Sequence, residues 1–165
     1  DIRDFLPPKQ GQRHLFAILS KLQSLKAGGS TEINKVLKTA VQRLPRRGIL
    51  LLISDCYGEI DGVVDALRHL VARGQELVLF HLLDKDEVDF PFSALTAFRD
   101  SETGAEIMCD PVRQQALYQK RLAEFKAAVK DGCKSCGADY RFVDTSEPIE
   151  IVLRDYLQFR RERGR

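Results

Sequence analysis

Two side chains of the sequence, Thr31 and Asp55, could hold a divalent cation. Thr31 stands in a loop that opens a predicted helix, and Asp55 ends the apolar run of residues 49–54. Both can lie on one rim of a sheet, and hard cations such as Mg²⁺ prefer hydroxyl and carboxylate oxygens, bound directly or through water. Two ligands do not make a metal site, however. Thr31 is also a competent helix cap, and an Asp at a strand end often caps the following turn, so both interpretations stay open.

Asp84 and Asp144 also end predicted strands. In an open α/β sheet, ligands bind beyond the carboxyl ends of the strands. An enzyme that uses Asp55, Asp84 and Asp144 for Mg²⁺-dependent phosphotransfer or hydrolysis is therefore one alternative. Against it, no arginine, lysine or histidine is placed by a motif to activate a nucleophile, and the sequence has no G-x-S-x-G or P-loop motif.

The remaining reactive side chains favour structural roles. Cys133 and Cys136 have the spacing of a redox pair, but they sit at the C-terminus of a predicted helix, where the helix dipole opposes thiolate formation. They also lie on its apolar stripe, so we expect buried, inert thiols. His81 lies inside a predicted strand, which is typical of a core histidine with satisfied hydrogen bonds. The three histidines form no zinc-binding pattern.

Composition and charge exclude several classes of function. The chain has 165 residues and a formal charge of +2, which fits one soluble domain at residues 1–165 without a membrane span. Four irregularly spaced cysteines indicate a reducing, cytoplasmic setting rather than a secreted disulfide framework. No aromatic or glycine pattern of an RNA-binding module accompanies the C-terminal arginines, so we expect no nucleic acid and a solvated helix end: Arg154, Arg160, Arg161, Arg163 and Arg165.

Hydrophobic periodicity predicts an α/β fold with a mainly parallel sheet. The uncharged run at residues 49–54 predicts a strand that is buried on both faces and lies at the centre of the sheet. A helix and a second apolar run at residues 76–83 complete a strand-helix-strand unit, whose two strands are parallel. A third strand is predicted at residues 138–144, and helices are predicted at residues 12–25, 33–44, 60–71, 111–136 and 149–157.

A β-hairpin insertion is predicted at about residues 95–109. After a connection at residues 85–94, two short strand candidates at residues 95–99 and 105–109 flank the turn-forming segment 100–104. Insertions at the carboxyl edge of a sheet often shape a binding surface. An equally good interpretation is that the hairpin only covers an exposed end of the sheet.

Five segments together resemble one bacterial family, and the resemblance runs over essentially the whole chain. It is the uncharacterised family of von Willebrand factor A-like proteins whose members are often encoded beside MoxR-type AAA+ ATPases. The segments are GSTEI at 29–33, RRGILLLISD at 46–55, DFPF at 89–92, FRDSETG at 98–104 and DT at 144–145.

The resemblance implies a three-layer αβα fold of the von Willebrand factor A (Rossmann-like) type with a metal-ion-dependent adhesion site. Thr31 matches the threonine of the second loop of that site, and Asp55 matches the aspartate of the third loop. Ser30, Ser54 and Asp84 would complete a partner-binding rim. The Asp-x-Ser-x-Ser segment of the first loop has no counterpart here, so Mg²⁺ affinity is expected to be weak or absent in this chain alone.

The resemblance also implies how the chain associates. Residues 1–6 match the end of the third strand of the family fold, so the domain is expected to be incomplete at its N-terminal side. The strand at residues 49–54 then has an unpaired apolar edge, and a homodimer through this edge is one way to cover it. The expected function is that of a non-enzymatic interaction module with a protein partner, for which a MoxR-type ATPase is the candidate.

Overall fold

A three-stranded parallel sheet forms the centre of the computed structural model, which describes residues 6–7, 9–25, 33–44, 47–100 and 103–162. Its strands are β1 (Gly48–Ser54), β2 (Gln75–Leu83) and β5 (Asp139–Asp144), in the order β1-β2-β5. Both neighbouring pairs are parallel. The helix α3 (Ile60–Ala72) connects β1 to β2 and completes the predicted strand-helix-strand unit. The predicted α/β class is confirmed.

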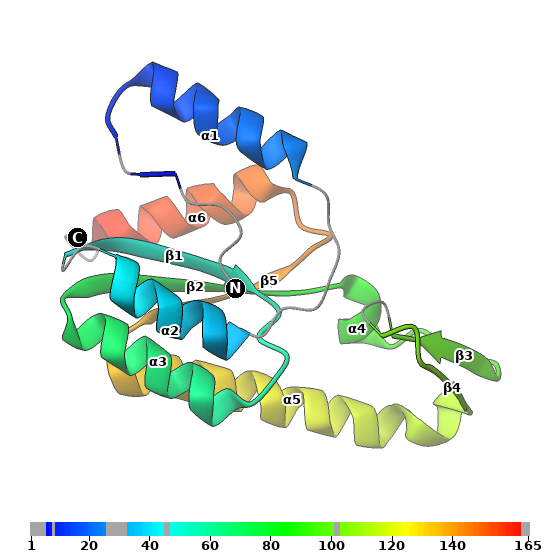
Figure 1. Ribbon diagram of the computed structural model, residues 1–165. Helices are drawn as coiled ribbons and strands as arrows, with labels where there is room; N and C mark the ends of the chain where they lie inside the picture. Colours follow the sequence, from blue (N-terminus) through cyan, green and yellow to red (C-terminus); the bar gives the residue numbers. More distant parts are fainter. Residues whose placement is uncertain (1–5, 8, 26–32, 45–46, 101–102, 163–165) are drawn as a thin grey trace.

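Helices cover both faces of this sheet, so the molecule has three layers (Figure 1). Helices α2 (Ile33–Arg43), α3 and α5 (Pro111–Cys136) lie on one face. On the other side lie α6 (Ile149–Glu162) and α1 (Gln12–Ser24). The predicted main helices therefore all exist, with ends shifted by a few residues.

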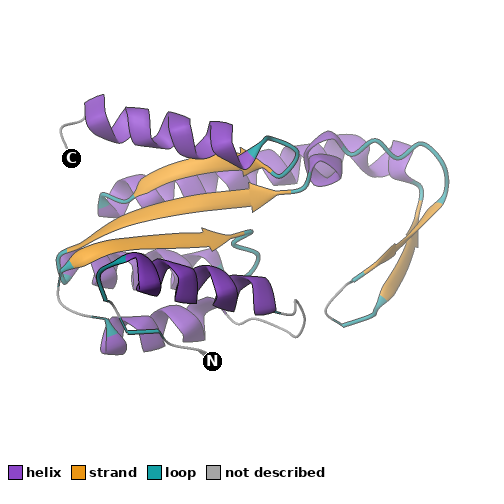
Figure 2. Cartoon of the chain, turned by 90° about the horizontal axis from the view of Figure 1, so that it is seen from above, coloured by secondary structure: helices purple, strands orange, loops and turns teal. Residues whose placement is uncertain are grey.

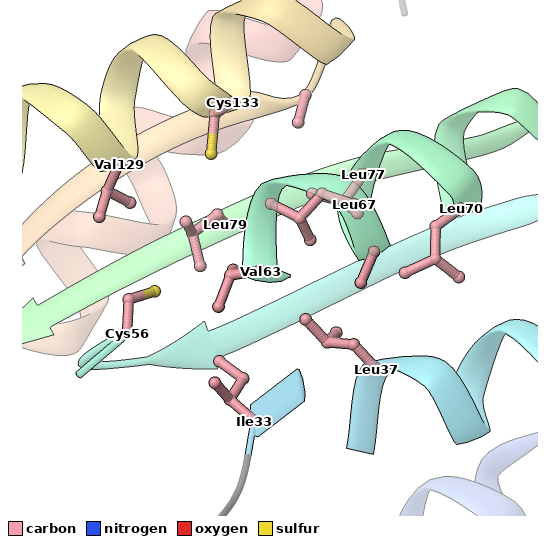
Figure 3. Packing of buried hydrophobic residues seen from close by; sticks show 12 residues of the cluster. Ile33, Leu37, Cys56, Val63, Leu67, Leu70, Leu77, Leu79, Val129 and Cys133 are labelled. Atoms are coloured by element: carbon pink, nitrogen blue, oxygen red, sulfur yellow. The ribbon is translucent and has the colours of Figure 1, made fainter. Parts of the chain in front are cut away.

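The larger core lies between β2 and the first group of helices (Figure 3). Leu77 and Leu79 of β2 meet Leu37 of α2, Leu67 of α3 and Val129 of α5, and each of these side chains is buried. Burying one such side chain contributes about 1.5 to 3 kcal/mol. The apolar stripes of the three helices thus cover one face of the sheet, with α3 against β2 and α5 against β5, while α2 packs beside α3.

A smaller core lies on the opposite face, under α6. Phe80 of β2 packs edge-on against Tyr156 of α6, with ring centroids 5.2 Å apart. Arg160 of the same helix forms an ion pair with Glu76 over 2.8 Å, and its side chain is only 15% exposed. The predicted solvated helix end is therefore wrong at Arg160, because the chain returns this arginine to an acidic residue at the start of β2.

The position of β1 differs from the prediction. It lies at an edge of the described sheet rather than at its centre, which is occupied by β2. It is not buried on both faces either: Leu50 and Leu52 pack on the larger core, whereas Ile49, Leu51 and Ile53 are 46–63% exposed. The apolar run alone could not tell a central strand from an edge strand, since that depends on which other strands are present.

Beyond the carboxyl ends of the strands, the chain forms a separate β-hairpin (Figure 2). Its antiparallel strands are β3 (Thr96–Arg99) and β4 (Glu106–Cys109), which confirms the predicted hairpin. The connection before it contains a helix that was not predicted, α4 (Lys85–Asp89). Five residues are too few to show a helical apolar period. Within the described residues, no helix has both the length and the apolar character that crossing a bilayer requires.

The four cysteines form no disulfide. Cys133 is fully buried in the larger core, and burial raises the pKa of its thiol to about 12. The thiol of Cys136 is half-buried and hydrogen-bonded to the carbonyl oxygen of Cys133 over 3.2 Å. The interpretation as structural thiols is confirmed for Cys133, which cannot ionise near neutral pH.

Candidate functional site

Three aspartates stand at the carboxyl edge of the sheet. Asp55 follows β1, Asp84 follows β2, and Asp144 is the last residue of β5, where it lies opposite Leu83 in the register. Since the three strands are parallel, the sequence brings all three carboxylates to the same edge. We call this edge, with Asp55, Asp84 and Asp144, the rim.

Asp55 lies in a tight turn whose backbone is fixed by side chains. Its Oδ1 atom accepts a hydrogen bond from the Tyr57 amide over 3.2 Å, and the Ser54 hydroxyl accepts one from the Cys56 amide over 3.0 Å. Cys56 has a φ of +58°, in the left-handed region that few residues other than glycine adopt, and its side chain is buried. Such a conformation persists only where the surroundings hold it. The exposed carboxylate of Asp55 is therefore presented by a rigid turn.

His81 fixes the position of this turn through a hydrogen bond to its backbone. Its ring is completely buried, and Nε2 lies 2.9 Å from the carbonyl oxygen of Asp55, while Nδ1 lies 3.0 Å from the hydroxyl of Tyr140. A carbonyl only accepts, so Nε2 carries the proton and Nδ1 accepts from Tyr140. Burial lowers the pKa of His81, which keeps the ring neutral. The prediction of a satisfied core histidine is confirmed.

Tyr57 connects the turn to α4 and α5. Its hydroxyl donates a hydrogen bond to Glu87 Oε1 over 3.1 Å, and its ring stacks on Phe125 with centroids 5.3 Å apart. Burial, reinforced by the carboxylate of Glu87, raises the pKa of Tyr57 well above its ordinary value. Tyr118 of α5 donates a second hydrogen bond to α4, to the carbonyl oxygen of Glu87 over 2.9 Å. Glu87 is thus the point where the turn, α4 and α5 meet.

Asp84 is engaged as a helix cap. Its Oδ1 atom accepts from the Asp86 amide over 2.8 Å, while Glu87 Oε2 accepts from the Asp84 amide over 2.8 Å, which together form a capping box. Its other oxygen accepts from the Thr145 hydroxyl over 3.2 Å. Both carboxylate oxygens therefore already hold α4 and the end of β5 in place.

Asp144 is held in a similar way, although it is partly exposed. Its Oδ1 atom accepts from the Ser146 amide over 2.8 Å, and the hydrogen bonds from Ser146 lower the pKa of the carboxyl. Lys85 and Lys126 lower this pKa further, and the Nζ atom of Lys126 lies 3.4 Å from the centre of the Phe142 ring. Burial lowers the pKa of this lysine. Asp144 therefore stays ionised at neutral pH, beside a lysine that rests on an aromatic ring.

The predicted metal ligands are placed only in part. Asp55 and Ser54 lie on the rim, together with Asp84, whereas Thr31 and Ser30 lie outside the described residues. The predicted convergence of Thr31 and Asp55 therefore stays a prediction. Across the described segments, no group of three or more histidine, cysteine, aspartate or glutamate side chains is close enough to hold a metal ion.

An aromatic cluster beside the rim was not predicted as a unit. Phe90 stacks on Tyr118 of α5 with centroids 4.3 Å apart, and on Phe98 of β3 with centroids 5.9 Å apart. Phe92 packs edge-on against both phenylalanines. The four rings fix the hairpin to the outer part of α5. The sequence does show the aromatic residues of the DFPF segment and of β3. It does not show that they meet, because this depends on the turn at Phe90, whose φ is +49°.

We call the hairpin, with Leu95 before it and Val112 at the start of α5, the arm. Four of its large apolar side chains are more than 60% exposed: Leu95 69%, Ile107 68%, Met108 61% and Val112 62%. The inner face of the arm is rigid, because the aromatic cluster holds it. The arm therefore presents apolar side chains to solvent from a fixed support.

Comparison with known proteins gives one match. Residues 1–130 match the family described as protein of unknown function DUF58. No curated protein and no solved structure matches the chain.

Proposed function

The chain belongs to the DUF58 family, and we propose that it is a non-enzymatic protein–protein interaction module that works with a MoxR-type AAA+ ATPase in an assembly or remodelling system. The family has no known function, so the choice of partner rests on the motifs that resemble von Willebrand factor A-like proteins. The same resemblance is our reason to propose a von Willebrand factor A type for this three-layer fold.

The observation that carries the proposal is the exposed apolar surface of the arm. Monomeric proteins expose scattered apolar side chains, but several of them on a part of the chain that stands apart from the main sheet are typical of a protein contact. Leu95, Ile107, Met108 and Val112 are exposed in this way on both faces of the arm, since Ile107 and Met108 are consecutive in β4. The aromatic cluster beneath holds them in place before any partner arrives, which lowers the entropic cost of binding.

The rim lies close to the arm and is joined to it through α4. Tyr57 of the rim turn and Tyr118 of α5 both bind Glu87, two residues before the end of that helix. We infer that one partner contacts both surfaces, with a basic side chain meeting Asp55. An ion pair at such an exposed position mainly sets orientation and contributes little to affinity.

The geometry of the rim supports binding more than catalysis. The one histidine near the rim is fully buried and uses both ring nitrogens internally. The Tyr57 hydroxyl is bound to Glu87, and both oxygens of Asp84 are occupied. A general base needs to reach a substrate proton within hydrogen-bond distance. Of the rim aspartates, Asp55 and Asp144 are the ones that keep an oxygen for an incoming group.

Mg²⁺ has a minor place in this proposal. Asp55 supplies one suitable carboxylate, but among the described residues it belongs to no group of three or more aspartate, glutamate, histidine or cysteine side chains that could hold an ion. We therefore propose weak Mg²⁺ binding or none by this chain alone. Calorimetric titration with MgCl₂ tests this statement, and an affinity in the micromolar range that is lost in Asp55→Asn would contradict it.

The proposed contact is tested by calorimetric titration with a MoxR-type ATPase from the same organism. Ile107→Asp and Met108→Asp place a charge in the arm, and each should weaken binding by at least about tenfold. Leu157→Asp is the matched control, since this side chain is 64% exposed on α6, away from the arm, and it should bind like the unmodified chain. Equal affinities for all four proteins would reject the arm as the contact.

One observation supports the alternative function, a Mg²⁺-dependent phosphotransfer or hydrolytic enzyme. Asp55, Asp84 and Asp144 do end three parallel strands at one edge. A phosphatase screen in the presence of MgCl₂ distinguishes the two functions, with Asp55→Asn as the control protein. Metal-dependent turnover that disappears in the variant would favour the enzyme.

A further inference from the structure

We propose that a hollow between α4 and α5 receives a short acidic segment of the partner, whose carboxylate binds Lys126 while a neighbouring apolar side chain packs on Leu122. The hollow is lined by Val88, Gln119, Leu122, Ala123 and Lys126. The inference rests on the proposed function, because the MoxR-type ATPase is the protein that supplies the segment. It deepens that function by naming the chemistry that the partner has to present.

The hollow follows one strip of α5. Its volume is about 390 Å³, within the range of about 300 to 1,000 Å³ that is usual for ligand pockets. Val88 lines it from α4, and the other four residues line it from α5. Residues three, four and seven positions apart share one face of a helix, so these four side chains lie in sequence order along it. The hollow therefore has an apolar middle, at Leu122 and Ala123, and a polar side chain at each end.

Lys126 is held in place at one end of the hollow. Its Nζ atom lies 3.4 Å from the centre of the Phe142 ring, and the residue is partly buried. Phe142 belongs to β5, which lies at the opposite edge of the described sheet from β1. An aromatic ring attracts a cation over its face. The ammonium group is thus oriented before a ligand arrives, which lowers the cost of binding.

The charge of Lys126 is not matched by a carboxylate in direct contact. Within the described part of the chain, Lys126 takes part in no ion pair, and the neighbouring Glu124 pairs with Lys120 instead. Asp144 attracts it from a greater distance, yet burial has the larger effect and lowers the pKa of the lysine. A partly buried cation without a close counter-ion is stabilised when an anion approaches it. A carboxylate is therefore the ligand group that complements this end of the hollow.

The spacing of the strip fits an extended peptide segment. Gln119 and Lys126 are seven positions apart, which corresponds to about 10 Å along the helix axis. An extended chain covers this length with about three residues. An aspartate or glutamate of the segment can then reach Lys126 while an apolar side chain lies over Leu122 and Ala123. The side-chain amide of Gln119, which is exposed, can donate a hydrogen bond to a backbone carbonyl of the segment.

The partner then carries charges of both signs. The proposed function places a basic side chain of the partner at Asp55, and the hollow places an acidic one at Lys126. Two contacts of opposite sign are satisfied together in one orientation and repel the partner in the reversed one. The pair of contacts therefore fixes how the partner lies against α4.

Calorimetric titration with a MoxR-type ATPase from the same organism tests the inference. Lys126→Glu should weaken binding by at least about tenfold, whereas Lys126→Arg should bind nearly as tightly as the unmodified chain because it keeps the charge. Lys130→Glu is the matched control, since it makes the same change of charge at an exposed position of α5 outside the hollow. Undiminished binding by Lys126→Glu, or an equal loss in Lys130→Glu, would overturn the inference.

A second pair of variants tests the hollow without touching the lysine. Ala123→Gln should fill its apolar middle and weaken binding by about tenfold, and it should leave the core intact because Ala123 is exposed. Ala127→Gln, at an exposed position of the same helix outside the hollow, should bind like the unmodified chain. This pair decides the question even if Lys126→Glu does not fold. Equal affinities for the two glutamine variants would overturn the inference.

The same titrations separate this inference from the proposed function. If Lys126→Glu and Ala123→Gln bind like the unmodified chain while Ile107→Asp loses binding, the hollow is not a contact and the proposed function stands. If the unmodified chain does not bind the ATPase at all, the proposed function is rejected and the inference is rejected with it.

Discussion

The Nε2 atom of His81 donates a hydrogen bond to the carbonyl oxygen of Asp55 over 2.9 Å. A fully buried ring in β2 thus determines where the turn after β1 places an exposed carboxylate. The same ring accepts from Tyr140 of β5 through its other nitrogen. One side chain therefore connects all three strands, and burial favours its neutral form, which carries the proton on Nε2.

Replacing His81 by Phe should destabilise the protein and reduce its sensitivity to acid. At pH 7.5 we expect a loss of about 2 kcal/mol in the free energy of unfolding, since two buried groups lose their hydrogen-bond partner. Burial lowers the pKa of His81 in the folded state, so the unfolded chain binds more protons once the pH falls below about 6.5. The contribution of His81 to stability is complete above that pH, declines as the pH falls, and levels off below the pKa of the folded state.

Denaturant unfolding at pH 7.5 and pH 5.5 checks this prediction. The free energy of unfolding of the unmodified chain should drop more between the two pH values than that of His81→Phe. His69→Gln serves as the control, because His69 is exposed on α3, and its pH dependence should match that of the unmodified chain. An equal drop in all three proteins would rule out His81 as the source.

Gly132→Ala should destabilise the packing of α5 on α3, although alanine usually favours a helix. A Cβ atom at position 132 would overlap Cγ2 of Val64, so the Val64 side chain or one of the two helices has to shift. We expect a loss of about 1 to 3 kcal/mol by thermal or denaturant unfolding. In a protein that already carries Val64→Ala, the substitution Gly132→Ala should cost much less stability, because the overlapping methyl group is gone. Additive effects of the two substitutions would show that the contact is not the cause.

Phe98→Ala should loosen the hairpin and leave the parallel sheet intact. Phe98 stacks on Phe90 and packs edge-on against Phe92. Among the described helices and strands, β3 and β4 make extensive contacts only with each other. An isolated two-stranded hairpin is marginally stable in water. Hydrogen exchange should therefore accelerate in residues 96–99 and 106–109 while β2 keeps its protection. Unchanged exchange in both hairpin strands would mean that the aromatic cluster does not hold the arm.

Asp84→Ala should cost about 1 kcal/mol, because it removes the N-cap of α4. Asp84→Asn should cost less, since the amide oxygen can still accept from the Asp86 amide. The measurement is the free energy of unfolding, together with amide exchange in residues 85–89. If alanine and asparagine have the same effect, the carboxylate matters for a reason other than capping.

The sequence predicted the helices and strands far better than it predicted which of them lie side by side. The apolar stripe of α5 and its Asp110-Pro111 start place that helix correctly, because each signal is local. The short helix α4 was missed, yet Asp84 and Glu87 have the spacing of a capping box and could have revealed it. The edge position of β1 could not be predicted, since an apolar run records that a strand needs partners and not whether they are present.

The candidate site shows the same division between local and distant contacts. The position of Asp55 at a strand end followed from the apolar run at residues 49–54. The position of His81 inside the next strand followed from the second apolar run, at residues 76–83. The bond from His81 to Tyr140 joins residues 59 positions apart, and the cluster around Phe90 joins the hairpin to α5. Contacts of this kind leave no periodic trace in the sequence, so the arm emerged as a unit only in the folded structure.

The most direct test of the proposed interaction module is a hydrogen-exchange comparison of the full chain alone and with the MoxR-type ATPase. Binding should slow amide exchange in the arm, at residues 95–99 and 106–112, and around the turn at residues 55–57, while the buried strand β2 stays unchanged. Protection that appears elsewhere and spares the arm, or no change at saturating ATPase, would contradict the account.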